Sequence, residues 1–495
     1  MKNVSDVILN FIIKIILILS SCILLNISHL MKYYIYLIII ALFLISCEKE
    51  NDNDIDIKPV IPAETTITDS FESGSIGEII KISNTEWKLG IADDNNNASL
   101  PDSWRSWWYI KADSVVTDSA IQITITNSGW PYYYNPVYSY NQKEWFRFES
   151  SEVTRNSRNE LVIRKKFDHS TVWISMFYPY TLTDLEDFIE SINGSPFLKI
   201  ITAGHSQQGN PLYLIKVTDF DVPVTEKKRI LIHARTHPAE TPPSFLLEGM
   251  LNFLISGEAD ANELLRKFEF HIFPMQNVDG VIAGNYRSTP KSENLEMLWT
   301  SAPGDPINLT SSAPVEVTVI HEHAKTLMTD GGPAVSIALN LHASNSEPDI
   351  RPFFFPHFGS EAYGYSDSEA SLWNKQLHFI SSFASHHGYD MIEPVPTTGG
   401  GSFAGKTYPE SWWWKNFQDQ VMAITMEMTY GRSGYYPRWI EPTDMREMGR
   451  NLALGIRDYY TLPASYFRIV VKEPDLGNLK YPDLYPPFAE DELKK

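Results

Sequence analysis

The hydrophobic and polar positions of the chain form two different patterns. Between residues 67 and 168, apolar and polar residues alternate in short runs, most clearly at 107–112, 120–126 and 160–164. Turn-forming residues separate these runs, and no window of helical length and period interrupts them. Short alternating strands with turns between them are typical of an antiparallel β-sandwich, so we predict such a domain over residues 67–178.

After residue 179 the pattern changes to apolar runs that alternate with windows of helical period. Strands are expected at 212–217, 230–235, 268–274, 335–341 and 421–428, and helices at 182–192, 244–255, 370–387 and 442–460. This alternation predicts an α/β domain over residues 179–465, with a largely buried mixed sheet flanked by helices. Residues 466–495 are expected to form a C-terminal tail.

Residues 1–47 contain two apolar stretches, at 7–30 and 33–46, and are not expected to belong to the fold. The second stretch follows Met31-Lys32 and ends in Leu44-Ile45-Ser46-Cys47. A short positive segment, an apolar run and a small residue before cysteine resemble a bacterial lipoprotein signal, in which Cys47 is lipidated. We therefore expect Met31 to be the true start, and the mature chain to be a lipid-anchored lipoprotein of the bacterial cell envelope.

Two alternatives stay open for this segment. In one, the apolar stretch is retained as an N-terminal membrane helix; in the other, Cys22 is the lipidated residue. Cys22 is less favoured because no polar linker follows it, whereas residues 48–66 after Cys47 are polar and without periodicity, as in a disordered tether. Since these are the only two cysteines, the mature chain has no disulfide.

The overall composition narrows the choice of partners. The chain has 495 residues, of which 43% are hydrophobic, and this suggests two or three domains with sizeable cores. Its formal net charge is −20. Because the phosphate backbone repels an acidic protein, we expect no nucleic-acid partner.

Candidate metal ligands lie where two of the predicted strands end. His237 and Glu240 follow the strand at 230–235, in a loop that leads into a helix, and His342 directly follows the strand at 335–341. In open α/β sheets this edge is where binding sites are built. Two imidazole nitrogens and one carboxylate suit Zn²⁺, which keeps three protein ligands and one open position in catalytic sites.

Two more residues at the same edge complete a set. Glu427 ends an otherwise apolar strand, where a carboxylate is costly without a partner or a function. Arg287 lies on a glycine-bounded loop after the strand at 268–274. Each residue alone has an ordinary structural explanation, but together they match metal-assisted amide hydrolysis: zinc as Lewis acid, a free carboxylate to move a proton, and a guanidinium for the oxyanion.

These motifs resemble the zinc carboxypeptidases, and within them the cytosolic-carboxypeptidase (Nna-like) subfamily, whose members have an N-terminal β-sandwich. The resemblance implies that His237, Glu240 and His342 bind one Zn²⁺ per chain, that Glu427 is the general base and acid, and that Arg287 clamps the oxyanion. It also implies that Asn285 contacts the substrate. The matching segments are 234–241, 277–281, 284–287, the strand before His342, and 425–427, with upstream landmarks at 71–74, 145–147 and 178–180.

Two positions depart from the family pattern. After the clamp arginine the family has an Asp-Leu-Asn-Arg segment that holds the terminal carboxylate of the substrate, and this chain has Asn294-Leu295-Glu296-Met297 there. Met297 cannot bind a carboxylate, and Glu296 repels one. For the tyrosine that the family places on a flap, the candidate here is Tyr408, beyond a glycine-rich segment at 397–402.

We therefore predict a zinc metallocarboxypeptidase-like hydrolase that cleaves an amide bond in a peptide, a peptidoglycan stem or a glycopeptide. One alternative is a deacylase or amidase that acts on a non-peptide amide with the same zinc site, which the loss of arginine at Met297 favours. The other is a binding protein that keeps the fold without turnover. Glu427 and Arg287 argue against that, since a binding protein has no use for both.

Overall fold

The computed structural model describes residues 64–129, 134–300, 309, 313–344, 351–396, 399–400, 406–431 and 438–470. These described residues belong to one compact unit. The predicted lipoprotein signal at 1–47, nearly all of the tether and the tail beyond residue 470 lie outside the described residues. Within the described part of the chain, no helix combines the length and the hydrophobicity needed to cross a membrane.

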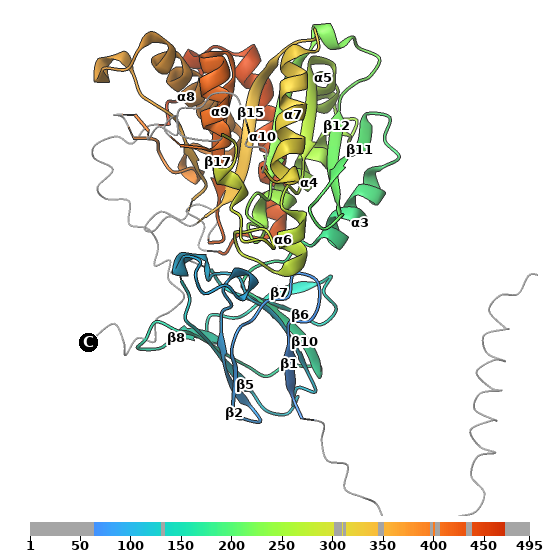
Figure 1. Cartoon of the computed structure of the whole chain (residues 1–495), viewed down its shortest axis with the longest axis vertical. Helices are drawn as coiled ribbons and strands as arrows, with labels where there is room; N and C mark the ends of the chain where they lie inside the picture. Colours follow the sequence, from blue (N-terminus) through green and yellow to red (C-terminus); the bar gives the residue numbers. More distant parts are fainter. Residues whose placement is uncertain are drawn as a thin grey trace, which may run out of the picture. The chain divides into compact units, whose positions relative to one another are not determined.

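The N-terminal region is built from short strands, and those that the structure describes form two five-stranded sheets (Figure 1). The strand orders are β1-β4-β10-β6-β7 and β2-β3-β5-β9-β8, and the two sheets share one hydrophobic core. The predicted β-rich domain is confirmed, but β3 and β5 pair in parallel, so the arrangement is not purely antiparallel. The strands are β1 (Thr66–Thr68), β2 (Ile79–Ser83), β3 (Glu86–Gly90), β4 (Tyr109–Asp113), β5 (Ile121–Thr126), β6 (Val137–Ser139), β7 (Trp145–Arg147), β8 (Val153–Arg155), β9 (Leu161–Lys165) and β10 (Thr171–Ser175).

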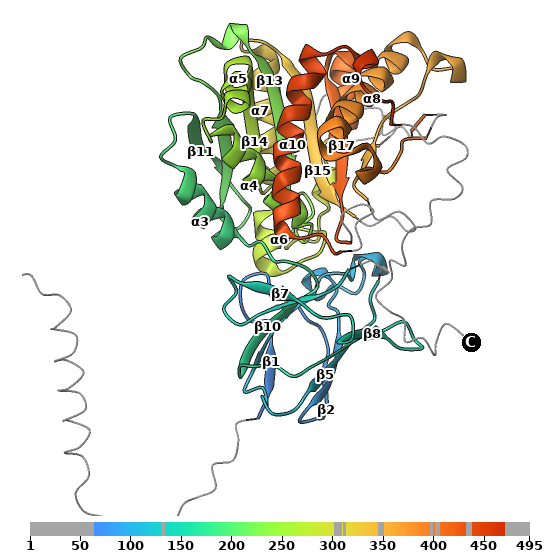
Figure 2. The ribbon, with the colours of Figure 1, turned by 180° about the vertical axis from the view of Figure 1, so that it is seen from behind.

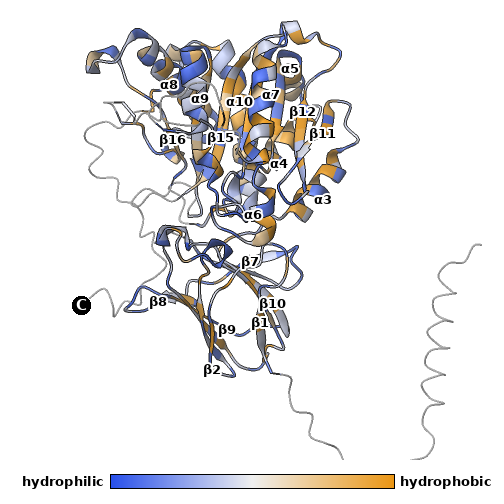
Figure 3. Cartoon of the chain, in the orientation of Figure 1, coloured by the Kyte–Doolittle hydropathy of each residue, from blue (hydrophilic) through white to orange (hydrophobic). Residues whose placement is uncertain are grey.

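The C-terminal region contains a seven-stranded mixed sheet of order β11-β12-β14-β13-β15-β17-β16. Its central strands β14, β13, β15 and β17 run parallel, while β12 and β16 run antiparallel to their neighbours. Because both faces of these central strands are covered, they are nearly continuous apolar runs (Figure 3). The strands are β11 (Leu198–His205), β12 (Pro211–Val217), β13 (Lys228–Ala234), β14 (Phe268–Phe273), β15 (Val335–Ala343), β16 (Phe353–Phe355) and β17 (Met422–Met428).

Helices cover both faces of this sheet, which confirms the predicted α/β architecture. Helices α4, α8 and α10 pack on one face, and α7 and α9 pack on the other (Figures 1 and 2). The helices are α3 (Leu182–Ile192), α4 (Pro242–Leu254), α5 (Ala259–Lys267), α6 (Val278–Ala283), α7 (Val315–Thr329), α8 (Asp367–His387), α9 (Pro409–Phe417) and α10 (Pro442–Thr461).

The two-residue period of the strands assigns each side chain to one of these faces. Ile230 of β13 belongs to the core under α4 and α10, whereas its neighbour Leu231 belongs to the core under α7 and α9. Ala338 of β15 also belongs to the second core. His342 follows Ala338 by four residues, so it projects to the α7 and α9 side, at the carboxyl end of its strand.

Side chains of the N-terminal sandwich bind directly to the start of two helices of the second region. The carboxylate of Glu72 accepts hydrogen bonds from the backbone N–H groups of Leu182 and Thr183, at 2.8 and 3.2 Å, in the first turn of α3. The guanidinium of Arg147 forms an ion pair with Glu441, just before α10, at 2.8 Å. These contacts satisfy free donors and charges at helix starts, so the two regions pack as one body.

Candidate active site

His237 and Glu240 lie in a buried loop between β13 and α4 that the side chain of Arg235 braces. The Arg235 guanidinium donates to the backbone carbonyls of Tyr180 and Pro238 and to the hydroxyl of Ser244. Arg235 itself has a φ of 59°, a left-handed conformation that a non-glycine residue adopts only when its surroundings hold it there. The loop is therefore fixed before any ligand binds.

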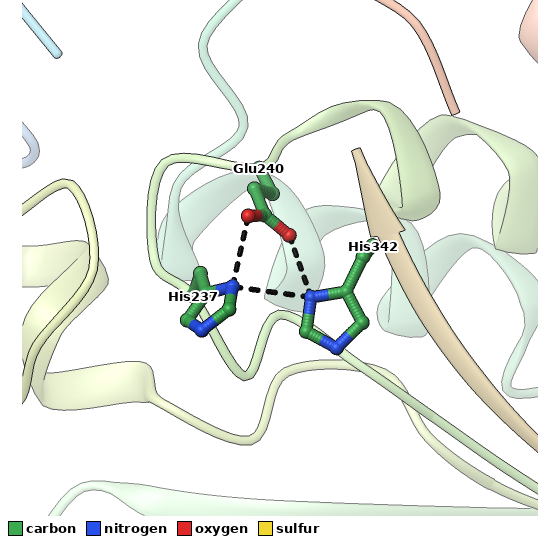
Figure 4. Close-up of side chains that lie close together, drawn as sticks. All are labelled: His237, Glu240 and His342. Atoms are coloured by element: carbon green, nitrogen blue, oxygen red, sulfur yellow. Dashed lines mark hydrogen bonds and ion pairs between the residues drawn. The ribbon is translucent and has the colours of Figure 1, made fainter. Parts of the chain in front are cut away.

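The side chains of His237, Glu240 and His342 converge on one point (Figure 4). The two oxygens of Glu240 lie 2.8 Å from Nδ1 of His237 and 2.8 Å from Nδ1 of His342. The two Nδ1 atoms are 3.1 Å apart, and all three side chains are buried. The structure thus brings together the three residues that the sequence predicted as metal ligands.

The donor set of this cluster fits zinc. Zinc binds imidazole nitrogen at about 2.0–2.1 Å, and a tetrahedron of that size has edges of roughly 3.3 Å, close to the observed Nδ1 separation. The other ring nitrogens point away from the centre: Nε2 of His237 lies 3.2 Å from Oδ1 of Asn294, and Nε2 of His342 lies 3.2 Å from Oε2 of Glu296. Outer partners of this kind fix the orientation of metal-binding imidazoles.

The electrostatic environment of the cluster favours a positive charge at its centre. Burial lowers the pKa of His342, but the carboxylates of Glu296 and Glu240 outweigh burial and hold that pKa well above its ordinary value. Burial likewise raises the pKa of Glu240, but the two imidazoles reverse this and lower it. A divalent cation at this point satisfies both carboxylates without requiring a buried imidazolium.

Glu427 lies beside the cluster because its strand is paired with that of His342. The two residues are partners in the parallel register of β15 and β17. Oε2 of Glu427 has no hydrogen-bond partner among the residues that the structure describes. Burial and the negative charge of Glu240 raise the pKa of Glu427 to about 8. A carboxyl group with raised proton affinity and an available oxygen is suited to accept a proton.

Arg287 is positioned by a residue of the N-terminal sandwich that the sequence did not reveal. One oxygen of Asp94 accepts the backbone N–H of Tyr286 at 2.6 Å, and the other accepts those of Arg287 and Ser288 at 2.9 and 2.7 Å. The hydroxyl of Ser288 also donates to Asp94, at 2.9 Å. The positive charge of Arg287 lowers the pKa of both Glu427 and His237, so the guanidinium lies close to the site.

The predicted substrate contact at Asn285 stays a prediction, and the structure gives its side chain partners within the protein. Its side chain is buried and exchanges hydrogen bonds with Asn95 of the sandwich, donating to Asn95 Oδ1 at 2.8 Å and accepting the Asn95 backbone N–H at 3.2 Å. Its amide also donates to the carbonyl of Ser288 at 3.0 Å. Because these bonds occupy the amide, Asn285 helps Asp94 to shape the loop that carries Arg287.

Tyr408 lies just before α9, half-buried and close to the site. The pKa of its phenol is raised by burial and by the negative charge of Glu296, and is lowered by Arg287. Tyr408 thus lies near Glu296 and Arg287. Its contact with the substrate stays a prediction.

The two residues that depart from the family pattern have different surroundings. Met297 is 50% exposed, so its side chain is at the surface. Glu296 is buried, and both of its oxygens accept hydrogen bonds from the side-chain amide of Asn340, at 3.0 and 3.2 Å. The negative charge therefore lies inside the site, directly behind His342.

Comparison with known proteins agrees with this geometry. Residues 67–177 match the cytosolic carboxypeptidase N-terminal domain, and residues 185–301 match the zinc carboxypeptidase family. These two segments are thus similar to the two domains of the cytosolic carboxypeptidases. The match includes His237, Glu240 and Arg287, while His342 and Glu427 lie beyond it. Zinc is the metal of this family and its members are hydrolases, as predicted.

The chain is similar to human cytosolic carboxypeptidase 2, with 28% identity over 253 residues, or 46% of this chain and 28% of the human protein. It is also similar to cytosolic carboxypeptidase 6 of Caenorhabditis elegans, with 27% identity over 62% of this chain and 68% of that protein. The chain therefore spans less than a third of the human relative. Among solved structures, the metallo-carboxypeptidase of Burkholderia cenocepacia has the same fold, with a TM-score of 0.64 and 19% identity over 81% of this chain and 99% of that chain.

Proposed function

We propose that this zinc carboxypeptidase domain hydrolyses an amide bond in a peptide or peptide-like substrate, with zinc held by His237, Glu240 and His342. The observation that carries the proposal is the convergence of these three side chains next to Glu427, whose carboxylate has an available oxygen. Fixed imidazole and carboxylate donors beside an unpaired acid are the arrangement that hydrolysis requires and that structural stability does not.

The residues of the chain divide the reaction between them. When bound, zinc supplies Lewis-acid activation of the scissile carbonyl and of water. Oε2 of Glu427 takes the proton that water loses as the new C–O bond forms, and then gives it to the leaving nitrogen as the C–N bond breaks. The guanidinium of Arg287 donates hydrogen bonds to the oxygen on which negative charge develops.

A peptidoglycan stem or a glycopeptide is the finer proposal for the substrate, and it follows from the proposed envelope location. A second candidate is a deacylase or amidase that acts on a non-peptide amide with the same residues. The buried carboxylate of Glu296 and the surface position of Met297 favour this second candidate over an enzyme that requires a free terminal carboxylate.

The test of hydrolysis uses zinc analysis and activity measured on the same samples. Wild type, His237→Ala and Glu427→Gln are purified, their zinc is quantified, and peptides with free and blocked C-termini are compared with N-acyl amides. We expect one zinc per wild-type chain, loss of zinc in His237→Ala, retention of zinc in Glu427→Gln, and cleavage by wild type alone. A wild-type chain that binds no zinc, or turnover that survives in Glu427→Gln, contradicts the proposal.

We also propose that Cys47 is lipidated and anchors the chain in the bacterial cell envelope. The support is the sequence alone: the apolar stretch at 33–46 after Lys32 and the small residue before Cys47. The test is metabolic labelling with an alkyne fatty acid in wild type, Cys47→Ser and Cys22→Ser. Label that is lost only in Cys47→Ser supports the anchor, and label that is lost only in Cys22→Ser contradicts this assignment.

A further inference from the structure

A second group of polar side chains lies beside the zinc ligands on the same face of the sheet. Asn340 and Thr425 are register partners on β15 and β17, each two residues before His342 and Glu427 respectively. Because side chains of a strand alternate between faces, these four residues project to the same side. Glu296 binds Asn340 from one direction, and Glu410 of α9 binds Thr425 from the other, accepting its hydroxyl proton at 2.6 Å.

This group is rich in hydrogen-bond acceptors that lack donors. Oδ1 of Asn340 and Oε2 of Glu410 are buried and have no partner among the residues that the structure describes. Asn340 and Glu410 are 2% and 3% exposed. Buried acceptors are almost always paired in folded proteins, so two such atoms in one group indicate a donor that arrives with a ligand.

The negative charge of the group also indicates that a ligand supplies the missing donors. Among the residues that the structure describes, the Asn340 amide and the ring nitrogen of His342 are the hydrogen-bond partners of the Glu296 carboxylate, which acts as an acceptor. No ion pair joins Glu296 or Glu410 to a lysine or arginine within the described part of the chain. Burial and then the charge of Glu296 raise the pKa of Glu410 to about 7, and they outweigh the hydrogen bond from Thr425 and the charge of His342, which lower it.

We propose that Glu296, Asn340 and Glu410 form a subsite for an alkylammonium group on the substrate, close to the scissile amide. An ammonium group offers three N–H donors and no acceptor, and so complements three acceptors that carry net negative charge. The proposal rests on the proposed function, because it names the class of substrate for the same zinc site. That class is an amide whose reacting residue carries a primary amine, as in a diamino acid.

The first test measures binding, so it does not depend on turnover. Lysine amide and norleucine amide have the same side-chain carbons and differ only in that norleucine carries hydrogen in place of the terminal ammonium. Calorimetry with the zinc-loaded chain is expected to show about tenfold or greater preference for lysine amide, since hydrogen bonds to a charged group are the strong ones. Equal affinity for the two amides overturns the subsite.

The variants in this test separate the subsite from the zinc site. Glu410→Gln keeps an oxygen for the Thr425 hydroxyl but removes the charge, and is expected to reduce the lysine preference at least fivefold while zinc content stays at one per chain. Glu296→Gln, with zinc content measured because it contacts His342, is expected to reduce the preference in the same way. The control is Glu263→Gln, which removes an exposed carboxylate of α5 and keeps the preference. A preference that persists in both subsite variants overturns the proposal.

A parallel assay separates failure of the subsite from failure of the proposed function. N-acyl dipeptide amides that contain lysine or norleucine next to the scissile bond are offered to the zinc-loaded wild type. Cleavage of both at equal rates overturns the subsite and leaves the hydrolase. Lysine-selective binding without cleavage of either supports the subsite and contradicts the proposed hydrolysis.

Discussion

The carboxylate of Asp94 accepts the backbone N–H of Arg287 at 2.9 Å, across a sequence separation of 193 residues. Asp94 belongs to the β-sandwich and Arg287 to the α/β region. The same carboxylate binds the residues on both sides of Arg287, so it holds the whole turn and not one atom. The sandwich therefore contributes to the proposed chemistry by fixing the position of the oxyanion clamp.

Asp94→Asn is expected to lower kcat/KM by about 10- to 100-fold. The hydrogen bonds from residues 286–288 now use both carboxylate oxygens, and an amide has only one acceptor oxygen. The loop is therefore expected to shift slightly, and a small displacement of a residue that contacts the reacting group has an effect of this size. Zinc content is expected to stay unchanged, since Asp94 has no hydrogen bond to His237, Glu240 or His342 in the described part of the chain. Steady-state kinetics and zinc analysis check both points. The control is Asp118→Asn, which removes an exposed charge from the same domain; equal kinetics in the two variants would falsify the positioning role.

The neutral partner of His237 gives a prediction about zinc affinity. Oδ1 of Asn294 lies 3.2 Å from Nε2 of His237, and a carboxylate there raises the basicity of the ring more than an amide does. Asn294→Asp is expected to tighten zinc binding by about tenfold, and Asn294→Ala to weaken it by about 10- to 100-fold. Competition with a chromophoric chelator measures both constants. The control is Asn262→Asp, which adds the same charge on the exposed side of α5 and is expected to leave the zinc affinity unchanged. If Asn262→Asp also binds zinc more tightly, the effect comes from long-range charge and not from the contact between residue 294 and His237.

Removal of zinc is expected to destabilise the fold. Without the metal, the buried carboxylate of Glu240 and the two imidazoles lose their shared cation, and a ligand that binds only the folded state at about 1,000 times its Kd stabilises that state by about 4 kcal/mol. Chelation is therefore expected to lower the melting temperature by several °C, and added zinc to restore it. In Glu427→Gln, chelation and zinc addition are expected to change the melting temperature as in wild type. In His342→Ala, added zinc is expected to leave the melting temperature unchanged. A melting temperature that chelation does not change contradicts a buried metal site.

A buried ion network on β14 predicts how stability depends on pH. Glu269 lies 2.7 Å from both Lys216 and His271. Burial raises the pKa of Glu269, but hydrogen bonds from His271 and Lys216 outweigh it and lower the pKa to about 2 from the ordinary 4.5. Because the folded-state pKa is depressed, the stabilisation is complete above pH 4.5 and is lost as the pH falls from 4.5 towards 2.

Glu269→Gln is therefore expected to be less stable than wild type at pH 6, with a difference that narrows between pH 4.5 and 2. Denaturant midpoints at several pH values measure the difference in the free energy of unfolding. The matched control is Glu263→Gln on the exposed face of α5. A difference between wild type and Glu269→Gln that stays constant down to pH 2 contradicts the assigned pKa.

The sequence predicted most elements with long or regular patterns and missed most of the short ones, and the 15-residue α7 was also absent from the predicted set. The strands β12, β13, β14, β15 and β17 and the helices α3, α4, α8 and α10 lie where the periodicity placed them, within a few residues. Helices α5 and α9 have nine residues each, fewer than a periodic window needs to be recognised. Strand β11 is an edge strand with many exposed residues, so its hydrophobic signal is weak.

The same limit applies to the site. His237, Glu240, His342 and Glu427 were predictable as neighbours because each follows or ends a strand of one sheet, and the carboxyl ends of parallel strands share an edge. Asp94 was not predictable, because nothing in its own segment indicates a partner near residue 287. Asn285 was assigned to the substrate from the family resemblance, whereas its side chain has hydrogen-bond partners in the sandwich and in its own loop.

The attachment of Asp94 to the Arg287 loop also gives an order to the assembly of the molecule. A chain is synthesised from its N-terminus, at about 5–20 residues per second, and N-terminal domains fold first. The sandwich precedes residues 285–288 along the chain, so when it folds first it presents its carboxylate to the loop. In this sense the first domain is a template for the second, and a chain synthesised in permuted order must form its clamp without that guide.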